Sequence, residues 1–314
     1  MEHDPGQHVP VLVEELIEVL EPAEGETFAD CTFGRGGHTR ALLKKLGRHG
    51  RVLVLDRDPD AISVARALAD EDQRVNVYQA EFAGLESIMT QANVSPDGVF
   101  FDLGVSSPQL DQARRGFSFR TRGPLDMRMD PGAGESAADW LATATLGEIA
   151  TVLKEYGEER YAKRIASRIV TARQQGAIET TTQLADIIVA AMPAKARYAA
   201  GGQHPATRSF QAIRIQVNAE LEQLRLGLEQ ALRVLKVGGR LAVISFHSLE
   251  DRLVKRFIRQ YANPPNPSRH LPLPSDLPAP RLLVKHRARR ASAGECQRNP
   301  RARSAVLRCA VKCR

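Results

Sequence analysis

Residues 99–109 read VFFDLGVSSPQ, an apolar run that ends at a single acid, Asp102, and is followed by small and polar residues. A continuous apolar run of this kind is typical of a strand buried on both faces of a parallel sheet. A carboxyl group at the end of such a strand is costly to bury unless a partner or ligand uses it. We therefore expect Asp102 to face a functional site, and residues 104–107 to form a tight turn without a helix.

The hundred residues before this stretch alternate between strand-like and helix-like patterns. Strands are predicted at 27–31, 51–58, 74–82 and 97–104, and helices at 38–47, 59–70 and 84–92. Pro59 suits the first turn of its helix, because its fixed φ angle is already helical. This alternation predicts an α/β fold with a doubly wound parallel sheet.

The pattern changes after residue 108. Residues 136–200 carry apolar side chains three and four positions apart, which predicts a helical insert. The spacing from Phe210 to Leu232 predicts one face of a long helix, and 236–248 reads as a glycine turn and a strand. The runs at 281–286 and 304–312 predict a terminal hairpin. We thus expect one discontinuous domain, 1–108 with 205–314, and a helical insert, 109–204.

Charge and cysteine content narrow the class of protein. The net charge is +7, and residues 281–314 hold eleven Lys and Arg against one acid, Glu295. Such a tail is either a solvated segment or a contact surface for a polyanion. No apolar stretch is long enough for a membrane span, and the four cysteines contain no C-x-x-C pair. We expect a cytoplasmic protein without a metal site.

A glycine-rich loop follows the first predicted strand. In ADCTFGRGGHT (29–39), Gly34, Gly36 and Gly37 allow a ligand to approach the backbone closely at the start of a helix. Asp56 ends the second strand, where an acid accepts hydrogen bonds from ribose hydroxyls. The pair predicts a cofactor that contains a nucleoside.

Two residues of the loop distinguish between cofactors. The dinucleotide fingerprint would place a third glycine at Thr39, and the acid Asp30 would repel a diphosphate. S-adenosyl-L-methionine has no phosphate and carries a sulfonium and an ammonium, so the loop favours it over NAD.

Asp102 then lies near the methyl-carrying end of the cofactor, because strands one, two and four meet at the switch point of the sheet. A nucleobase amine must be held with its lone pair aimed at the methyl carbon, roughly 3–3.5 Å away. The Asp102 carboxylate and the Leu103 carbonyl are candidates to accept its hydrogens. The alternative is that Asp102 only caps the following turn.

Several long motifs give the chain a specific resemblance. DCTFGRGGHT, DLGVSSPQLD, GPLDMRMD, HPATRSFQAIRIQVNAEL and GGRLAVISFHSLEDR, with shorter blocks from residue 8 to about 310, resemble the bacterial 16S rRNA cytosine-N4 methyltransferases of the RsmH/MraW type. The resemblance implies a Rossmann-like methyltransferase sheet that depends on S-adenosyl-L-methionine. It also implies an inserted helical domain for RNA recognition and methylation of a cytosine in the decoding region, with 16S rRNA in the small subunit as partner.

Carried onto this chain, the cofactor contacts of the family fall on few positions. They are Gly36, Gly37, His38, Asp56, Phe82, Asp102 and Gln109, and the position of the glycine loop itself adds Asp30 and Gly34 as cofactor-binding candidates. His38 joins through its backbone, and Phe82, at the end of the third strand, would pack on the adenine. One departure is Arg122, which stands where the family usually has Asp.

The sequence supports the candidate RNA contacts less strongly than it supports the candidate cofactor contacts. They are the aromatic residues Phe117 and Phe119, for stacking on the target base, and Arg128, Arg208, Arg301 and Arg303, for phosphates. An internal salt bridge of Arg128 with Asp126 is an equal alternative. His247, Ser248 and Asp251 suggest a hydrolase triad, but no G-x-S-x-G turn accompanies them.

Other classes of protein remain open at this point. They are an NAD-linked oxidoreductase and a catalytically inactive RNA-binding protein on a methyltransferase fold. The oligomeric state stays open too, with a homodimer as one option.

Overall fold

The computed structural model describes residues 10–194, 204–263 and 279–314. By the contacts between its residues the chain divides into two compact units, Met1–Gly104 with Leu221–Arg314, and Val105–Glu220. The predicted boundaries at 108 and 205 thus differ from the observed divisions. The second boundary lies later in the chain than predicted, because the helix that follows residue 205 packs into the core of the second unit. None of the helices among the described residues is long and apolar enough to cross a membrane.

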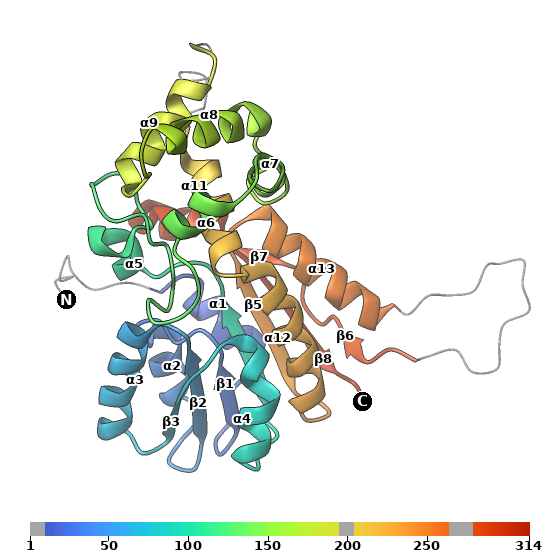
Figure 1. The fold of residues 1–314 in the computed structure, drawn as a ribbon. Helices are drawn as coiled ribbons and strands as arrows, with labels where there is room; N and C mark the ends of the chain where they lie inside the picture. Colours follow the sequence, from blue (N-terminus) through green and yellow to red (C-terminus); the bar gives the residue numbers. More distant parts are fainter. Residues whose placement is uncertain (1–9, 195–203, 264–278) are drawn as a thin grey trace, which may run out of the picture. The chain divides into compact units, whose positions relative to one another are not determined.

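The first unit is built on a mixed eight-stranded sheet with the order β3-β2-β1-β4-β5-β8-β6, and β7 pairs with β8 (Figure 1). Its strands are β1 Thr27–Asp30, β2 Arg51–Asp56, β3 Val75–Gln79, β4 Gly98–Asp102, β5 Arg240–Ser245, β6 Leu282–Leu283, β7 Arg289–Arg290 and β8 Val306–Lys312. The pairs among β1 to β5 are parallel. The predicted doubly wound sheet is therefore confirmed.

The helices of the first unit cover both faces of this sheet. They are α1 Val13–Leu20, α2 Gly37–Leu43, α3 Pro59–Glu71, α4 Leu85–Gln91, α12 Glu220–Val234, α13 Ser248–Ala262 and α14 Ala293–Arg298, with 3-10 turns at Phe82–Gly84 and Pro300–Ser304. Phe28 and Phe100 point into a core with α1 to α3, and Ala29 and Phe101 into a second core with α4, α12 and α13. Alternate residues of each strand thus serve opposite layers.

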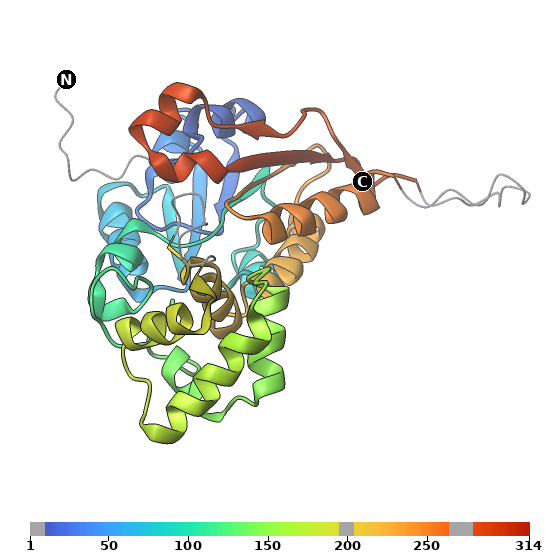
Figure 2. The same ribbon diagram turned by 90° about the horizontal axis from the view of Figure 1, so that it is seen from above.

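The C-terminal segment belongs to this sheet as an integral part. β8 pairs antiparallel with β5, and β6 pairs antiparallel with β8, as the predicted hairpin requires. The segment also lies against α1 (Figure 2), where Arg289 is paired with Glu18, and Glu295 accepts a hydrogen bond from the Leu12 N–H at 2.8 Å. Part of its basic charge is thus used inside the fold.

The second unit is helical and has a core of its own. Its helices are α5 Ser107–Asp111, α6 Ala137–Thr143, α7 Leu146–Glu155, α8 Ala162–Gln175, α9 Thr181–Ala191 and α11 Thr207–Val217, with a 3-10 turn at Ala113–Arg115. The expected turn without a helix is wrong, because α5 begins at Ser107. Ser106 caps it, and the Gln109 side chain accepts a hydrogen bond from the Ser106 N–H at 2.9 Å.

The single long helix predicted from Phe210 to Leu232 is also wrong. It is two helices, α11 and α12, separated at Ala219, whose φ of 48° is left-handed. Beside it, Asn218 donates to the Met127 carbonyl at 2.7 Å and accepts from the Met129 N–H at 2.8 Å. These distant partners fix the break, so the local apolar spacing could not show it.

Gly98 provides a test of the packing between β1 and β4. It is the register partner of Phe28, and a Cβ atom at Gly98 would lie 2.2 Å from Cε1 of that buried ring. We expect Gly98→Ala to lower the free energy of unfolding by about 1–3 kcal/mol, because a fully buried ring has no room to move. Gly176→Ala is the matched control, since nothing lies within 4 Å of its Cβ position. Equal chemical denaturation curves for the two variants would contradict this packing.

Candidate active site at the carboxyl edge of the sheet

Three acids end three adjacent strands of the first unit. Asp30, Asp56 and Asp102 are the last residues of β1, β2 and β4, and β1 pairs with both other strands. Parallel strands place these ends at one edge of the sheet, as the sequence predicted. The three carboxyl groups nevertheless have different surroundings.

The carboxylate of Asp30 holds the glycine loop closed. One oxygen accepts a hydrogen bond from the Thr32 N–H at 3.0 Å, and the other accepts from the Thr39 hydroxyl at 2.6 Å. Only 1% of Asp30 is exposed, and burial raises the pKa of its carboxyl to about 7. Both ends of the loop are thereby tied to β1.

The loop itself approaches neighbouring groups too closely for side chains. Gly34 and Gly36 have φ angles of 55° and 76°, in the region that favours glycine. A Cβ atom on Gly36 would lie 2.6 Å from the Phe33 ring, and one on Gly37 would lie 2.5 Å from Pro10. Glycine is therefore required at positions 36 and 37 because a larger side chain would clash with its neighbours.

Asp56 is linked to the same loop. Its Oδ2 accepts from the Gly34 N–H at 2.8 Å, and its Oδ1 accepts from the Asp58 N–H at 2.9 Å. Burial raises the pKa of Asp56 to about 6, although the backbone donors of Gly34 and Asp58 oppose this shift. Each carboxylate oxygen has two lone pairs, so both retain capacity to accept from a ribose.

Asp102 is half-buried, and the hydrogen-bonding capacity of its carboxyl group is not fully used. Its backbone N–H donates to the Thr32 hydroxyl at 2.5 Å, which joins β4 to the glycine loop. Its Oδ2 lies 3.5 Å from His38 Nδ1, while Oδ1 is buried without a hydrogen-bond partner among the described residues. Burial, followed by the charge of Glu250, raises the pKa of Asp102 to about 8. Such a perturbed carboxyl in a sheet-edge site is a candidate catalytic group.

His38 is more than a member of the glycine loop. Its ring is buried, Nε2 lies 2.9 Å from the Val11 carbonyl, and the ring meets Phe100 edge-on at 6.1 Å. Burial lowers the pKa of His38 below its usual value. The sequence predicted only a backbone role for this residue, because its side-chain partners are far away along the chain.

The sequence also predicted no role for Glu250. It sits in the first turn of α13, where its carboxylate accepts from the Phe246 N–H at 2.8 Å, and it is 3.2 Å from His247 Nε2. Asp251 is instead paired with Arg308 at 2.7 Å. These pairings leave no His–Asp couple for the hydrolase triad.

Two further predicted residues lie in the first unit. Phe82 does not end strand β3 but begins the 3-10 turn that follows it, half-buried and edge-on to Phe101 at 5.4 Å. The Leu103 N–H donates to the Ile244 carbonyl at 3.0 Å, which fixes this peptide beside β5. Arg301 is half-buried and Arg303 is exposed in the turn before β8.

The remaining predicted residues lie in the second unit. Gln109 is buried and caps α5. Phe117 is 6% exposed and belongs to the helical core, so it is not available for stacking on a base. Phe119 is half-buried between His204 and Phe210, at ring distances of 4.4 and 4.8 Å.

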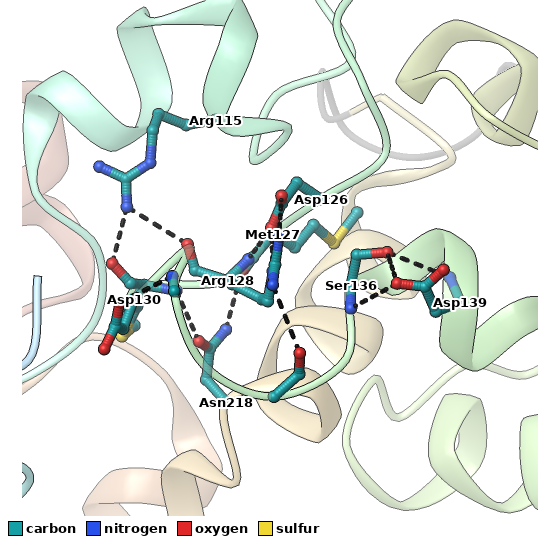
Figure 3. A network of polar contacts seen from close by, with 11 residues as sticks. Arg115, Asp126, Met127, Arg128, Asp130, Ser136, Asp139 and Asn218 are labelled. Carbon is teal, nitrogen blue, oxygen red and sulfur yellow. Dashed lines mark hydrogen bonds and ion pairs between the residues drawn. The ribbon is translucent and has the colours of Figure 1, made fainter.

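Several arginines among the described residues of this unit have defined partners. Arg128 makes two bonds of 2.8 Å to the Asp126 carboxylate (Figure 3). The internal salt bridge, rather than a free side chain for RNA, is what the structure contains. Arg115 donates to the Met129 carbonyl at 2.8 Å, and the exposed Arg208 donates to the Glu158 carbonyl at 3.3 Å. Arg122, at the departure from the family pattern, is exposed.

The chain is similar in sequence to curated small-subunit rRNA methyltransferases. The chain is 53% identical over 312 residues to Ribosomal RNA small subunit methyltransferase H of Xanthomonas oryzae pv. oryzae (strain PXO99A), covering 99% of this chain and 90% of the relative. It is 54% identical over 307 residues to the protein of that name in Thiobacillus denitrificans, with 97% of each covered. An rRNA methylase structure from Streptococcus thermophilus aligns with a TM-score of 0.41 and 11% identity, over 96% of this chain and 94% of that one.

The comparison with families gives a match that covers nearly the whole chain. Residues 6–313 match the MraW methylase family. The chain therefore belongs to the MraW methylase family.

Proposed function

We propose that this protein transfers a methyl group from S-adenosyl-L-methionine to the N4 amine of a cytosine in the decoding region of 16S rRNA, in the cytoplasm. The observation that carries the proposal is the half-buried Asp102 carboxyl, whose Oδ1 has no partner among the residues that the structure describes, at the carboxyl edge of the sheet beside the glycine loop. Two further supports are the family and the relatives named for small-subunit rRNA methylation.

The residues present fit the cofactor. Asp56 can accept from the ribose while it holds the glycine loop through the Gly34 N–H. Asp102 Oδ1 is a buried acceptor that lacks a donor in the described parts of the chain. When bound, the cofactor supplies an electrophilic methyl group on a cationic sulfur.

The chain's own groups would then orient the acceptor. Asp102 Oδ1 accepts one hydrogen of the cytosine amine, and the Leu103 carbonyl accepts the other. Held in this way, the nitrogen lone pair points away from both acceptors, toward the methyl carbon. The base leaves its stack to enter the site, as enzymes that modify bases require. The amine becomes acidic once methylated, so its proton leaves readily to a nearby acceptor.

The two other readings of the sequence predict different outcomes. An oxidoreductase would bind NAD, and an inactive RNA-binding protein would bind the subunit without labelling it. Incubating the protein with labelled S-adenosyl-L-methionine and unmethylated small subunits, and mapping the label, separates the three. Absence of label in the rRNA, with cofactor binding demonstrated, would contradict the proposal.

Asp102 is the residue most directly tested. We expect Asp102→Ala to lower the single-turnover rate of methyl transfer by at least about 100-fold, because the amine loses its acceptor. Affinity for S-adenosylhomocysteine, measured by calorimetry, should change much less, since the loop contacts remain. A near-normal rate for this variant would remove Asp102 from the mechanism.

Asp56 is expected to act on binding. Asp56→Ala should weaken the affinity for S-adenosylhomocysteine by about 10- to 100-fold, because both the ribose acceptor and the tether of Gly34 are lost. Glu71→Gln is the control, as it also removes one negative charge but lies exposed on α3. An unchanged dissociation constant for Asp56→Ala would place the ribose elsewhere.

A further inference from the structure

The side chain of His38 is placed to act on the reaction through Asp102. Its Nδ1 lies 3.5 Å from Asp102 Oδ2, and it is 94% buried, since its exposed side-chain fraction is 6%. Nε2 lies 2.9 Å from the Val11 carbonyl, which can only accept a hydrogen bond. Nε2 therefore carries a proton, and in the neutral ring Nδ1 is an acceptor that faces the carboxyl group.

At 3.5 Å, with His38 buried and Asp102 half-buried, two acceptors repel each other, and a proton held by either group makes the contact favourable. Either Asp102 is protonated and faces Nδ1, or His38 is protonated and faces a carboxylate. The two forms contain the same number of protons. They differ in that only the second presents a full carboxylate to a substrate amine at Oδ1.

We propose that His38 is a positioning residue for methyl transfer, and that its Nδ1 takes the proton of Asp102 so that a carboxylate faces the amine without losing a proton to solvent. This inference rests on the proposed function. The C–N bond forms as the S–C bond breaks with its electron pair going to sulfur. The methylated amine then gives one proton to Asp102 Oδ1, and the pair later releases a proton to solvent.

The surroundings of the pair favour this exchange. Burial favours the neutral form of both groups, because it raises the pKa of Asp102 and lowers that of His38. The charged groups that act on the pair are acids: Glu250 on Asp102, Glu295 on His38, and Asp30 on both. Asp30 and Glu295 favour the protonated imidazole, and Glu250 disfavours the ionised Asp102.

The ring is also held in the required orientation. Its anchor, Val11, is followed by Leu12, whose N–H donates to Glu295 of α14 at 2.8 Å. The ring packs edge-on against Phe100 of β4, two residues before Asp102. A histidine that served only to fill space would not need a fixed tautomer directed at a carboxyl group.

The pH profile of the single-turnover rate, with saturating cofactor and unmethylated small subunits, tests the inference. In the wild type, the rate should be nearly independent of pH between about 6 and 7, below the Asp102 pKa of about 8, because the pair keeps one proton in both forms there. In His38→Gln, Asp102 must lose its proton to solvent, so the rate should rise up to tenfold per pH unit below the pKa of Asp102. At pH 7 it should be at least about tenfold below the wild type.

Glutamine is chosen because its amide can keep the bond to the Val11 carbonyl while it lacks a basic nitrogen. Its affinity for S-adenosylhomocysteine should stay within about threefold of the wild type. His38→Asn should show the same pH slope, and serves if the glutamine variant does not fold. His49→Gln, at an exposed histidine of the same unit, should leave rate and profile unchanged.

Each outcome has one meaning. A wild-type rate that itself rises tenfold per pH unit would overturn the inference without any variant. A His38→Gln rate within twofold of the wild type, with a parallel profile, would also overturn it and leave the methyltransferase proposal intact. Absence of transfer by the wild type would instead contradict the proposed function.

Discussion

The bonds of the Asp30 carboxylate are the constraint on which the site depends. One carboxylate accepts from the Thr32 N–H at the start of the glycine loop and from the Thr39 hydroxyl in the helix that follows. The Thr32 hydroxyl accepts a hydrogen bond from the Asp102 N–H, and the Gly34 N–H donates one to the Asp56 carboxylate. The ends of β1, β2 and β4 are thereby connected through a loop of a few residues. Moving any one of these strands would break a buried or partly buried hydrogen bond, which is expensive to leave unmade.

The same arrangement is electrostatically unfavourable for the free protein, because it holds three acids in surroundings that disfavour their ionised forms. Burial raises the pKa of Asp30, Asp56 and Asp102 to about 7, 6 and 8. Raised carboxyl pKa values mean that the folded state binds more protons than the unfolded chain between about pH 4 and 8, so these groups make the free protein less stable as pH rises. A cofactor with a sulfonium and an ammonium would relieve this cost. Acids that are unfavourable for the fold alone are explained by a cationic ligand.

The sequence predicts the sheet and its ligand-binding edge because both depend on local signals. The apolar runs of β2 and β4 are continuous, and the acids follow them directly. What it misses depends on contacts across long stretches of chain. Ala219 interrupts a regular apolar spacing because Asn218 is bonded to Met127 and Met129, and Phe117 looks like a stacking residue until the helical core encloses it. Nothing within a few residues of either position reports these contacts.

The pair of His38 and Asp102 shows why site chemistry is harder to predict than site location. Asp102 can be placed from its strand, but its protonation depends on a ring that is anchored by the Val11 carbonyl. That carbonyl lies beside a peptide held by Glu295, the one acid in a basic C-terminal segment. Charge composition suggests either a solvated segment or a contact surface for a polyanion. The fold instead uses its single acid to hold the turn before α1, and through it the tautomer of a histidine at the site.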